Sequence, residues 1–138
     1  MEKYTIVMVE NDEDERMFMR EGFEEFGQFT VLDIVEDGNA LFEWLENHAG
    51  LSPDLILTDL SMPGKNGYDI LKWLKASLKF SGIPVIITST SSAPVSVKKC
   101  LDLGAVEYLL KPDTFTEYID FARRLHEMVT QNEWARQH

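Results

Sequence analysis

Apolar and polar positions alternate along this chain in five repeats of the same pattern. Five short apolar runs, rich in β-branched residues, lie at positions 4–9, 30–35, 54–59, 85–88 and 106–110. Uninterrupted apolar runs of this length are typical of strands that are buried on both faces, as in a parallel sheet. Between the runs, apolar residues recur every three or four positions, which is the spacing of an amphipathic helix. The pattern therefore predicts five strands that alternate with five helices.

Three of the predicted helices begin with a recognisable cap. A short polar side chain at the start of a helix accepts a hydrogen bond from a free backbone amide, and an acid three residues later favours the positive end of the helix dipole. The pairs are Asp12 with Glu15, Asn66 with Asp69, and Thr114 with Glu117, the last predicted as a full capping box. In the third helix we expect Leu78 to extend the buried stripe that begins at Ile70.

The alternation of strands and helices predicts one doubly wound α/β domain. Right-handed crossovers are nearly obligatory between parallel strands, so helices must cover both faces of a five-stranded parallel sheet. A length of 138 residues suits one such domain. We assign residues 1–131 to this domain and residues 132–138 to a polar C-terminal tail.

The net charge, the hydropathy and the cysteine content of the chain limit the partners and the compartment that we expect. The formal net charge of −11 argues against direct binding to nucleic acid, because phosphate backbones are bound by clustered Lys and Arg. No stretch reaches the ~18 apolar residues that a membrane span requires, and the charged start of the chain does not resemble a signal peptide. The single cysteine, Cys100, rules out an internal disulfide and fits a reducing compartment. We therefore expect a cytoplasmic protein that binds neither nucleic acid nor membrane.

Polar residues collect where the predicted strands end. Glu10 and Asn11 follow the first strand, Asp59 ends the third, Ser89 follows the fourth and Lys111 follows the fifth. The carboxyl ends of parallel strands lie at one edge of the sheet, where ligands bind in open α/β folds, so these residues can form one pocket. An isolated Asp after a strand is more often a turn or capping residue. Asp59, however, has an acid, a hydroxyl and an amine at the neighbouring strand ends.

This set of side chains suits phosphoryl transfer to a carboxylate. Asp59 would be the nucleophile that forms an aspartyl phosphate. Glu10 would help to hold Mg²⁺, which needs only one or two protein carboxylates in addition to phosphoryl oxygens. Lys111 and Ser89 would contact the phosphoryl oxygens, where negative charge develops.

Over residues 4–130 the chain resembles the receiver domain of two-component response regulators. Each matching motif alone is weak, but their order and spacing together are specific. The motifs are the acidic cluster after residues 6–9, the segment from Asp59 to Gly64, the segment from Pro84 to Thr90, Gly104-Ala105, Tyr108 and Lys111-Pro112. The resemblance implies a flavodoxin-like (βα)5 fold with strand order 2-1-3-4-5.

The resemblance also assigns a phosphoacceptor and a set of metal ligands. Asp59 takes the phosphoryl group, and Mg²⁺ is held by Glu10, Asn11, Asp59 and the backbone carbonyl of Ser61. Asn11 departs from the family pattern, which has a second acid at this position. A neutral amide is a weaker ligand for a hard cation than a carboxylate, so we expect weakened but not abolished Mg²⁺ binding.

Contact and switching roles are implied for the other motif residues. Lys111 contacts the phosphate, and its peptide bond to Pro112 is expected to be cis. Ser89 and Tyr108 occupy the two switch positions, although an aromatic residue in a strand is ordinarily part of the core.

The biological role implied by the resemblance is signalling in a phosphorelay. A histidine kinase or phosphotransfer protein is the donor, and a downstream protein reads the conformational change that follows phosphorylation. Such a domain catalyses only its own phosphorylation and dephosphorylation. The fourth helix, fifth strand and fifth helix could also serve as a homodimer surface.

Three other functions compete with this interpretation. A flavin- or nucleotide-binding protein would place Gly, Ser or Thr amides after the first strand, whereas this chain has acids there, which repel phosphate. A phosphohydrolase of the aspartyl-phosphate type resembles Asp-x-Asp after the first strand, whereas Asp59 follows the third and Ser61 stands two residues beyond it. A receiver-like domain that no longer takes phosphate stays open, with Asn11 as its supporting feature.

Overall fold

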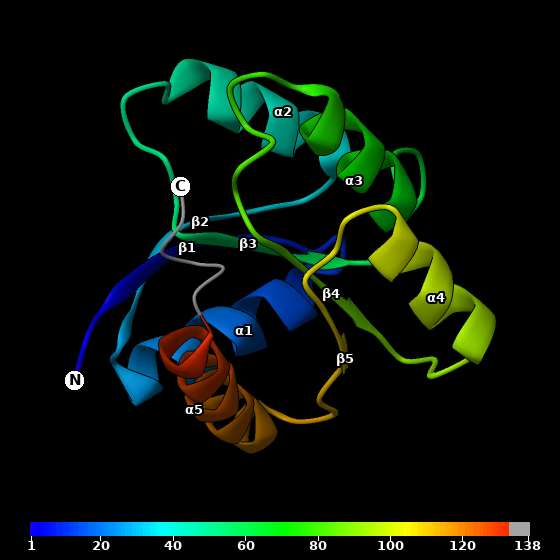
Figure 1. Cartoon of the computed structure of the whole chain (residues 1–138). Coiled ribbons are helices and arrows are strands. Elements are labelled where there is room, and N and C mark those ends of the chain that lie inside the picture. Colours follow the sequence, from blue (N-terminus) through cyan, green and yellow to red (C-terminus); the bar gives the residue numbers. More distant parts are fainter. Residues whose placement is uncertain (133–138) are drawn as a thin grey trace.

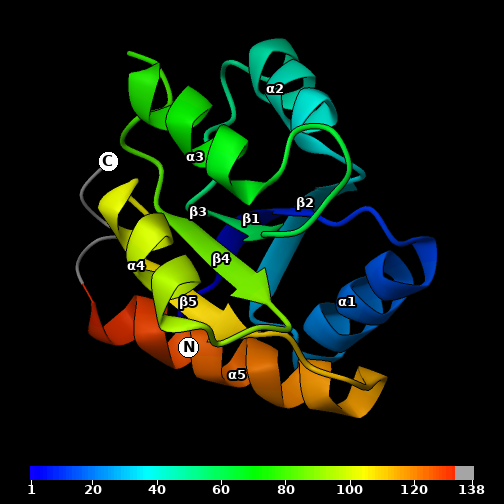
Figure 2. The ribbon, with the colours of Figure 1, turned by 90° about the vertical axis from the view of Figure 1, so that its right-hand side faces the viewer.

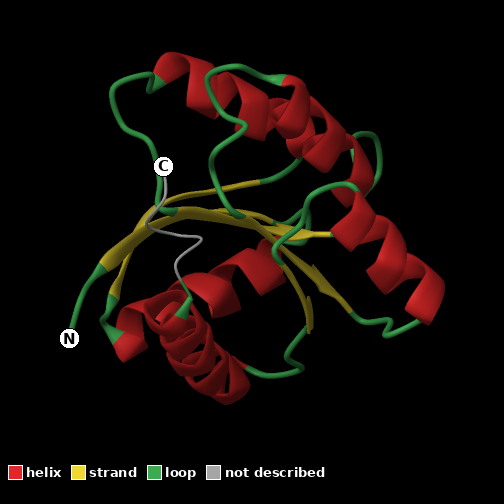
Figure 3. Cartoon of the chain, in the orientation of Figure 1, coloured by secondary structure: helices red, strands yellow, loops and turns green. Residues whose placement is uncertain are grey.

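The computed structural model describes residues 1–132 and shows a sheet between two layers of helices (Figures 1 and 3). The predicted strands and helices are present in the predicted order, and the strand bounds agree within one residue. The strands are β1 (Tyr4–Val9), β2 (Phe29–Val35), β3 (Leu55–Asp59), β4 (Val85–Ser89) and β5 (Glu107–Leu110). The helices are α1 (Glu13–Phe26), α2 (Gly38–Asn47), α3 (Gly67–Ala76), α4 (Pro94–Asp102) and α5 (Phe115–Gln131). Apart from its first residue, the predicted tail lies outside the described residues.

All strands are parallel and follow the order β2-β1-β3-β4-β5, as the resemblance implies. The strand order changes direction between β1 and β3, which is where doubly wound sheets open a crevice at their carboxyl ends. The register pairs Val9 of β1 with Thr58 of β3, and Asp59 of β3 with Thr88 of β4. The residues that end these strands therefore lie next to one another at one edge of the sheet.

Separate apolar cores cover the two faces of the sheet. Successive side chains of a strand point to opposite faces. Val7 and Ile56 pack with the buried residues of α2, α3 and α4, whereas Met8 and Leu57 pack with those of α1 and α5. Figure 1 shows α2 and α3 above the sheet and α1 and α5 below it. Because both faces are buried, the central strands are apolar at most positions, and this explains the apolar runs in the sequence.

Two predicted details of the helix ends are wrong. Leu78 is fully exposed and not part of the buried stripe, because α3 ends before it and the helical spacing no longer applies. At the start of α5, the Thr114 hydroxyl accepts the Glu117 amide at 3.3 Å, but the Glu117 carboxylate accepts the amide of Asp113 at 3.0 Å, so the capping box is incomplete. The capping box that starts at Asn66 is complete.

Helix α4 has the fewest tertiary anchors. It buries only Cys100, whereas each of the other helices buries at least three residues. Its N-cap residue, Ala93, offers no side chain that can accept a bond from the free amides of the first turn. Val95 and Leu101 are exposed on its surface. Figure 2 shows α4 beside the carboxyl halves of β4 and β5. No helix within residues 1–132 is both long enough and apolar enough to span a membrane.

Candidate functional site

Four of the predicted site residues meet at the carboxyl edge of the sheet. Asp59 and Ser89 are the last residues of β3 and β4, and Glu10 and Lys111 come directly after β1 and β5. Backbone hydrogen bonds continue the sheet past the strand ends, because the amide of Glu10 donates to Val35 and the amide of Lys111 donates to Ser89, each at 2.9 Å. The polar side chains are therefore carried by backbone that the sheet holds in place.

Lys111 bridges the two carboxylates. Its Nζ lies 2.6 Å from Oε1 of Glu10 and 3.4 Å from Oδ2 of Asp59. Only 1% of Glu10 and 6% of Asp59 is exposed. Oε2 of Glu10 accepts a hydrogen bond from the amide of Asp12, whereas Oε1 has no hydrogen bond among the described residues and is compensated by the ion pair. Since buried charge requires a partner, the lysine is needed to keep both acids at this edge.

Two negative charges face one positive charge, and this sets the pKa values of the site. Burial and then the charge of Glu10 raise the pKa of Asp59, while Lys111 opposes the rise. Burial on its own would lower the pKa of Lys111, but the close contact with Glu10 and the charges of Asp59 and Glu10 outweigh burial and raise that pKa. Lys111 is therefore a cation at neutral pH, and Asp59 is a more basic carboxylate than one in water.

The donor groups at this edge fit a hard divalent cation that needs few protein ligands. Glu10 and Asp59 supply two carboxylates. The exposed Asn11 follows Glu10 with a side-chain amide, and the exposed Ser61 stands two residues after Asp59 with a backbone carbonyl. Within residues 1–132 no group of three or more His, Cys, Asp or Glu side chains is placed to hold a metal. Mg²⁺ needs only one or two carboxylates. The buried Glu10 oxygen without a hydrogen bond is an available ligand of the right type.

Ser91 connects the two predicted switch residues. Ser89 is 3% exposed, and its hydroxyl accepts the amide of Ser91 at 3.1 Å. The carbonyl of the same Ser91 accepts the hydroxyl of the half-buried Tyr108 at 2.6 Å. The structure therefore brings Ser89 and Tyr108 together through one loop residue. This role could not be predicted from the sequence, because Ser91 is one of several similar residues in a Ser/Thr-rich loop.

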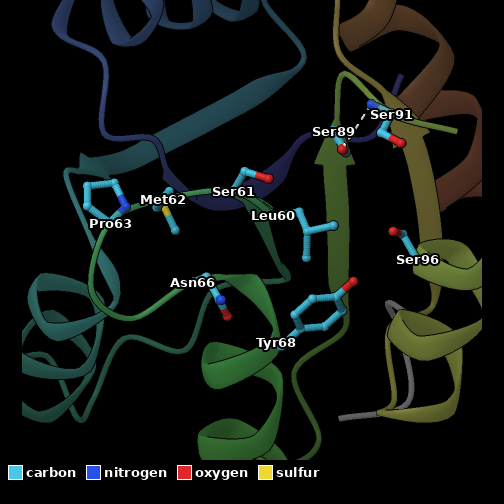
Figure 4. Close-up of a pocket in the computed structure, with 9 residues that line it drawn as sticks. All are labelled: Leu60, Ser61, Met62, Pro63, Asn66, Tyr68, Ser89, Ser91 and Ser96. Carbon is cyan, nitrogen blue, oxygen red and sulfur yellow. Dashed lines mark hydrogen bonds between the residues drawn. The ribbon is translucent and has the colours of Figure 1, made fainter. Parts of the chain in front are cut away.

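A cavity of about 530 Å³ opens beside this loop. Figure 4 shows Ser89 and Ser91 at its upper rim, Tyr68 rising from the start of α3 and Ser96 from α4. The complete lining is Leu60, Ser61, Met62, Pro63, Asn66, Tyr68, Ser89, Ser91 and Ser96. The cavity thus shares Ser61 and Ser89 with the carboxyl-edge site but extends away from Asp59 toward α3 and α4.

A partly buried hydrogen bond between α1 and α5 was not predicted. The hydroxyl of Tyr118 donates to Oε2 of Glu15 at 2.7 Å, and burial together with the nearby Glu15 raises the pKa of Tyr118. The two helices are in close contact here, since a Cβ placed on Gly22 would lie 2.5 Å from Cβ of Tyr118. Helical spacing in the sequence places each residue on its own helix, but it does not reveal that α1 and α5 are neighbours.

The expected cis bond before Pro112 is wrong. No peptide bond among residues 1–132 is cis. The trans form is favoured for bonds that precede proline by about 0.5–1 kcal/mol, and the expectation of a cis bond came from the family resemblance and not from the residues around it.

Comparisons with known proteins agree with this architecture. The family model described as "Response regulator receiver domain" matches residues 6–123. The two-component response regulators ARR9 and ARR7 of Arabidopsis thaliana are 45% identical over 76 residues and 36% identical over 107 residues. These matches cover 55% and 72% of this chain, but 32% and 50% of the relatives, so the chain spans no more than half of either protein. The phosphorylated cyanobacterial phytochrome response regulator RcpA superposes with a TM-score of 0.77 at 25% identity, covering 93% of this chain and 96% of that one. This chain belongs to the family of response regulator receiver domains.

Proposed function

We propose that Asp59 accepts a phosphoryl group in a phosphorelay. The observation that carries the proposal is the buried pair of carboxylates, Glu10 and Asp59, that share a single lysine. An uncompensated charge in a buried site opposes folding and is typical of positions that serve chemistry. The membership of the family and the phosphorylated state of RcpA support the same assignment.

In the proposed reaction an Oδ atom of Asp59 attacks the phosphorus of a phosphohistidine. An O–P bond forms while the N–P bond breaks, and the leaving imidazole keeps the electron pair and takes up a proton. The products are an acyl phosphate on Asp59 and a free histidine on the donor, which would be a histidine kinase or a phosphotransfer protein. Water can attack the same phosphorus later and return the carboxylate, so the chain would catalyse only its own phosphorylation and dephosphorylation.

We assign Mg²⁺ binding to the Glu10 and Asp59 carboxylates, the Asn11 side chain and the backbone carbonyl of Ser61. When bound, the ion supplies positive charge that neutralises the phosphoryl oxygens. Glu10 would then turn from Lys111 toward the metal, which releases the lysine for a second role. Asn11 offers a dipole in place of a charge, so the site would need a higher Mg²⁺ concentration than one with a third acid.

Lys111 and Ser89 would act on the phosphoryl group itself. Nζ of Lys111 is already 3.4 Å from the oxygen of Asp59 that it pairs with, and it would contact a phosphoryl oxygen attached there. Its charge stabilises the negative charge that develops during transfer. Ser89, at the end of the adjacent strand, would donate its hydroxyl proton to another phosphoryl oxygen.

The output would follow from the connection between Ser89, Ser91 and Tyr108. Movement of Ser89 toward the phosphoryl group removes the acceptor of the Ser91 amide, and the loop that moves also holds the Tyr108 hydroxyl. Tyr108 is then free to turn inward, which makes this loop a two-state element that the new charge biases. The altered surface of α4, β5 and α5 would be read by a downstream protein. This surface includes the exposed Val95 and Leu110, and it could also serve a homodimer.

The cytoplasm is the compartment that we propose for this activity. The one cysteine is a free thiol and is buried, which fits a reducing environment.

Intact-mass spectrometry after incubation with a small phosphodonor and Mg²⁺ tests the proposal. The wild-type chain should gain one phosphoryl group, and Asp59→Asn should gain none. Asp113→Asn is the matched control, since Asp113 is an exposed acid beside the same strand ends, and it should be phosphorylated like the wild type. An adduct of equal yield in Asp59→Asn would refute the assignment. A wild type that gains no mass would support a receiver that has lost phosphorylation.

A further inference from the structure

Positive charge is concentrated in one stretch of this acidic chain. Residues 60–101 contain six of the 13 basic residues but only one of the 24 acidic residues. The lysines are Lys65, Lys72, Lys75, Lys79, Lys98 and Lys99. The one acid, Asp69, is occupied in the capping box of α3, where its carboxylate accepts the amide of Asn66 at 3.1 Å. The next residue after this stretch, Asp102, pairs with Lys98 at 2.7 Å, so the positive charge of this basic surface rests on the other five lysines.

The two helices of this stretch lie side by side, as Figures 1 and 2 both show. Nζ of Lys99 on α4 lies 4.1 Å from the ring centroid of Tyr68 on α3, a cation–π contact that joins the helices. At the other end of α3, a Cβ placed on Gly104 would lie 2.7 Å from Cε of Lys75. Lysines of both helices are therefore presented on one side of the molecule.

The cavity beside the Ser89–Ser91 loop opens in the middle of this basic surface. Tyr68 forms one wall of the cavity, and Ser96 of α4 lies on the other side (Figure 4). The ammonium group of Lys99 lies over the ring of this tyrosine. The exposed Lys65 stands in the loop between Pro63 and Asn66, both of which line the cavity. The Lys65 side chain starts on the α2 side of this loop, because a Cβ placed on Gly38 would lie 2.6 Å from Cβ of Lys65. The hollow thus combines apolar and hydroxyl-bearing walls with the ammonium group of Lys99 at its rim.

We propose that this cavity, between the β3–α3 loop and α4, is the docking site for an acidic segment of a partner protein. Carboxylates of the segment would contact Lys65 and Lys99, and Lys72 lies one helical turn beyond Tyr68 on the same face of α3. One apolar or aromatic side chain of the segment would enter the cavity and pack on Tyr68. The rest of the chain carries most of the acidic residues and repels such a segment. Electrostatic attraction therefore directs the segment to this face and sets its position there.

A short acidic peptide suits this surface better than a nucleic acid. A polyanionic backbone requires a long track of cations, whereas the lysines here lie near a cavity of limited size. The docking site is proposed for the unphosphorylated protein, in which the Ser89–Ser91 loop lines the cavity, and the test uses that form. Failure of one proposal therefore leaves the other standing.

The test is titration of the full chain with a fluorescein-labelled peptide of Asp and Glu residues that contains one central Trp. Fluorescence anisotropy measures the affinity, and backbone NMR shifts locate the site. The double variant Lys65→Gln/Lys99→Gln should weaken binding by about three- to tenfold, since exposed ion pairs contribute modestly. Lys3→Gln/Lys79→Gln is the matched control, because it removes the same charge from exposed lysines away from the cavity, and it should change the affinity less than twofold.

Further outcomes decide between this site and its rivals. Binding that weakens with added salt, requires the central Trp and shifts residues 60–68 and 89–99 supports the docking site. Equal weakening in the two double variants would show a general charge effect and overturn it. Shifts confined to other surfaces would overturn it as well. A single-stranded RNA oligonucleotide of the same charge that binds more tightly than the peptide would reassign the surface to nucleic acid.

Discussion

Replacing Tyr118 with phenylalanine removes a single hydroxyl group from the interface between α1 and α5. That hydroxyl donates to Oε2 of Glu15 at 2.7 Å, and Tyr118 itself is 2% exposed. Hydrogen bonds to charged acceptors contribute about 1.5–3 kcal/mol. Glu15 is only half-buried and can regain water when the hydroxyl is lost, which favours the lower part of that range. We expect Tyr118→Phe to reduce the free energy of unfolding by about 1.5–2 kcal/mol.

Urea denaturation followed by circular dichroism measures this loss as a lower midpoint with an unchanged slope. Tyr108→Phe is a matched control, because it removes a hydroxyl that donates to a backbone carbonyl at an exposed position. That change should reduce the free energy of unfolding by only about 0.5 kcal/mol. The single variant Glu15→Ala and the double variant Glu15→Ala/Tyr118→Phe complete a cycle that isolates the coupling, which we expect to be on the order of 1 kcal/mol.

Equal losses in Tyr118→Phe and Tyr108→Phe would refute the reasoning. So would simple additivity of the two changes in the cycle, because it would show that the hydroxyl and the carboxylate do not stabilise each other.

Two substitutions at the carboxyl-edge site give further expected results. Asn11→Asp adds a third acid and should lower the Mg²⁺ concentration that gives half-maximal phosphorylation, and the effect should be larger at low salt. Superimposable titration curves of the wild type and the variant would place Asn11 away from the metal. Asp59→Asn should raise the free energy of unfolding at pH 7 without metal, because the pKa of Asp59 is raised above its ordinary value of 3.8 and its ionisation therefore opposes folding. This gain should disappear as the pH falls below 3.8, where the acid is protonated in both states, so a gain that is constant across a pH series of denaturation curves would contradict it.

The fold was predictable because strands buried on both faces are apolar along most of their length. The runs that became β3 and β4 begin with three consecutive apolar residues and turn polar only at their carboxyl ends, and their shortness favours strands over helices. Once the strands are parallel, their carboxyl ends must share an edge, so Asp59 and Lys111 could be placed together before any distance was known. The geometry of the sheet, and not local propensity, is what allowed the position of these residues to be predicted.

The details that the sequence did not predict depend on distances between elements. The order of the strand ends predicted that Lys111 lies near Asp59, but in the structure its Nζ is closer to Glu10. The bond between Glu15 and Tyr118 needs two helices to be neighbours, which no periodicity within either helix reveals. Leu78 continued the apolar spacing of α3 but lies beyond the end of that helix, where the backbone no longer follows a helical course.

Helix α4 has little free energy to lose when it opens. With one buried residue and no side-chain hydrogen bond at its N-cap, its local unfolding requires far less free energy than global unfolding, whereas the six buried residues of α5 tie that helix to the whole domain. Backbone amides of α4 should consequently exchange with deuterium well before those of α5. When a protein binds an ordered α4, the conformational entropy that the helix loses on ordering reduces the free energy of binding. Any event that stiffens this helix beforehand then raises the affinity for such a protein without adding a single contact.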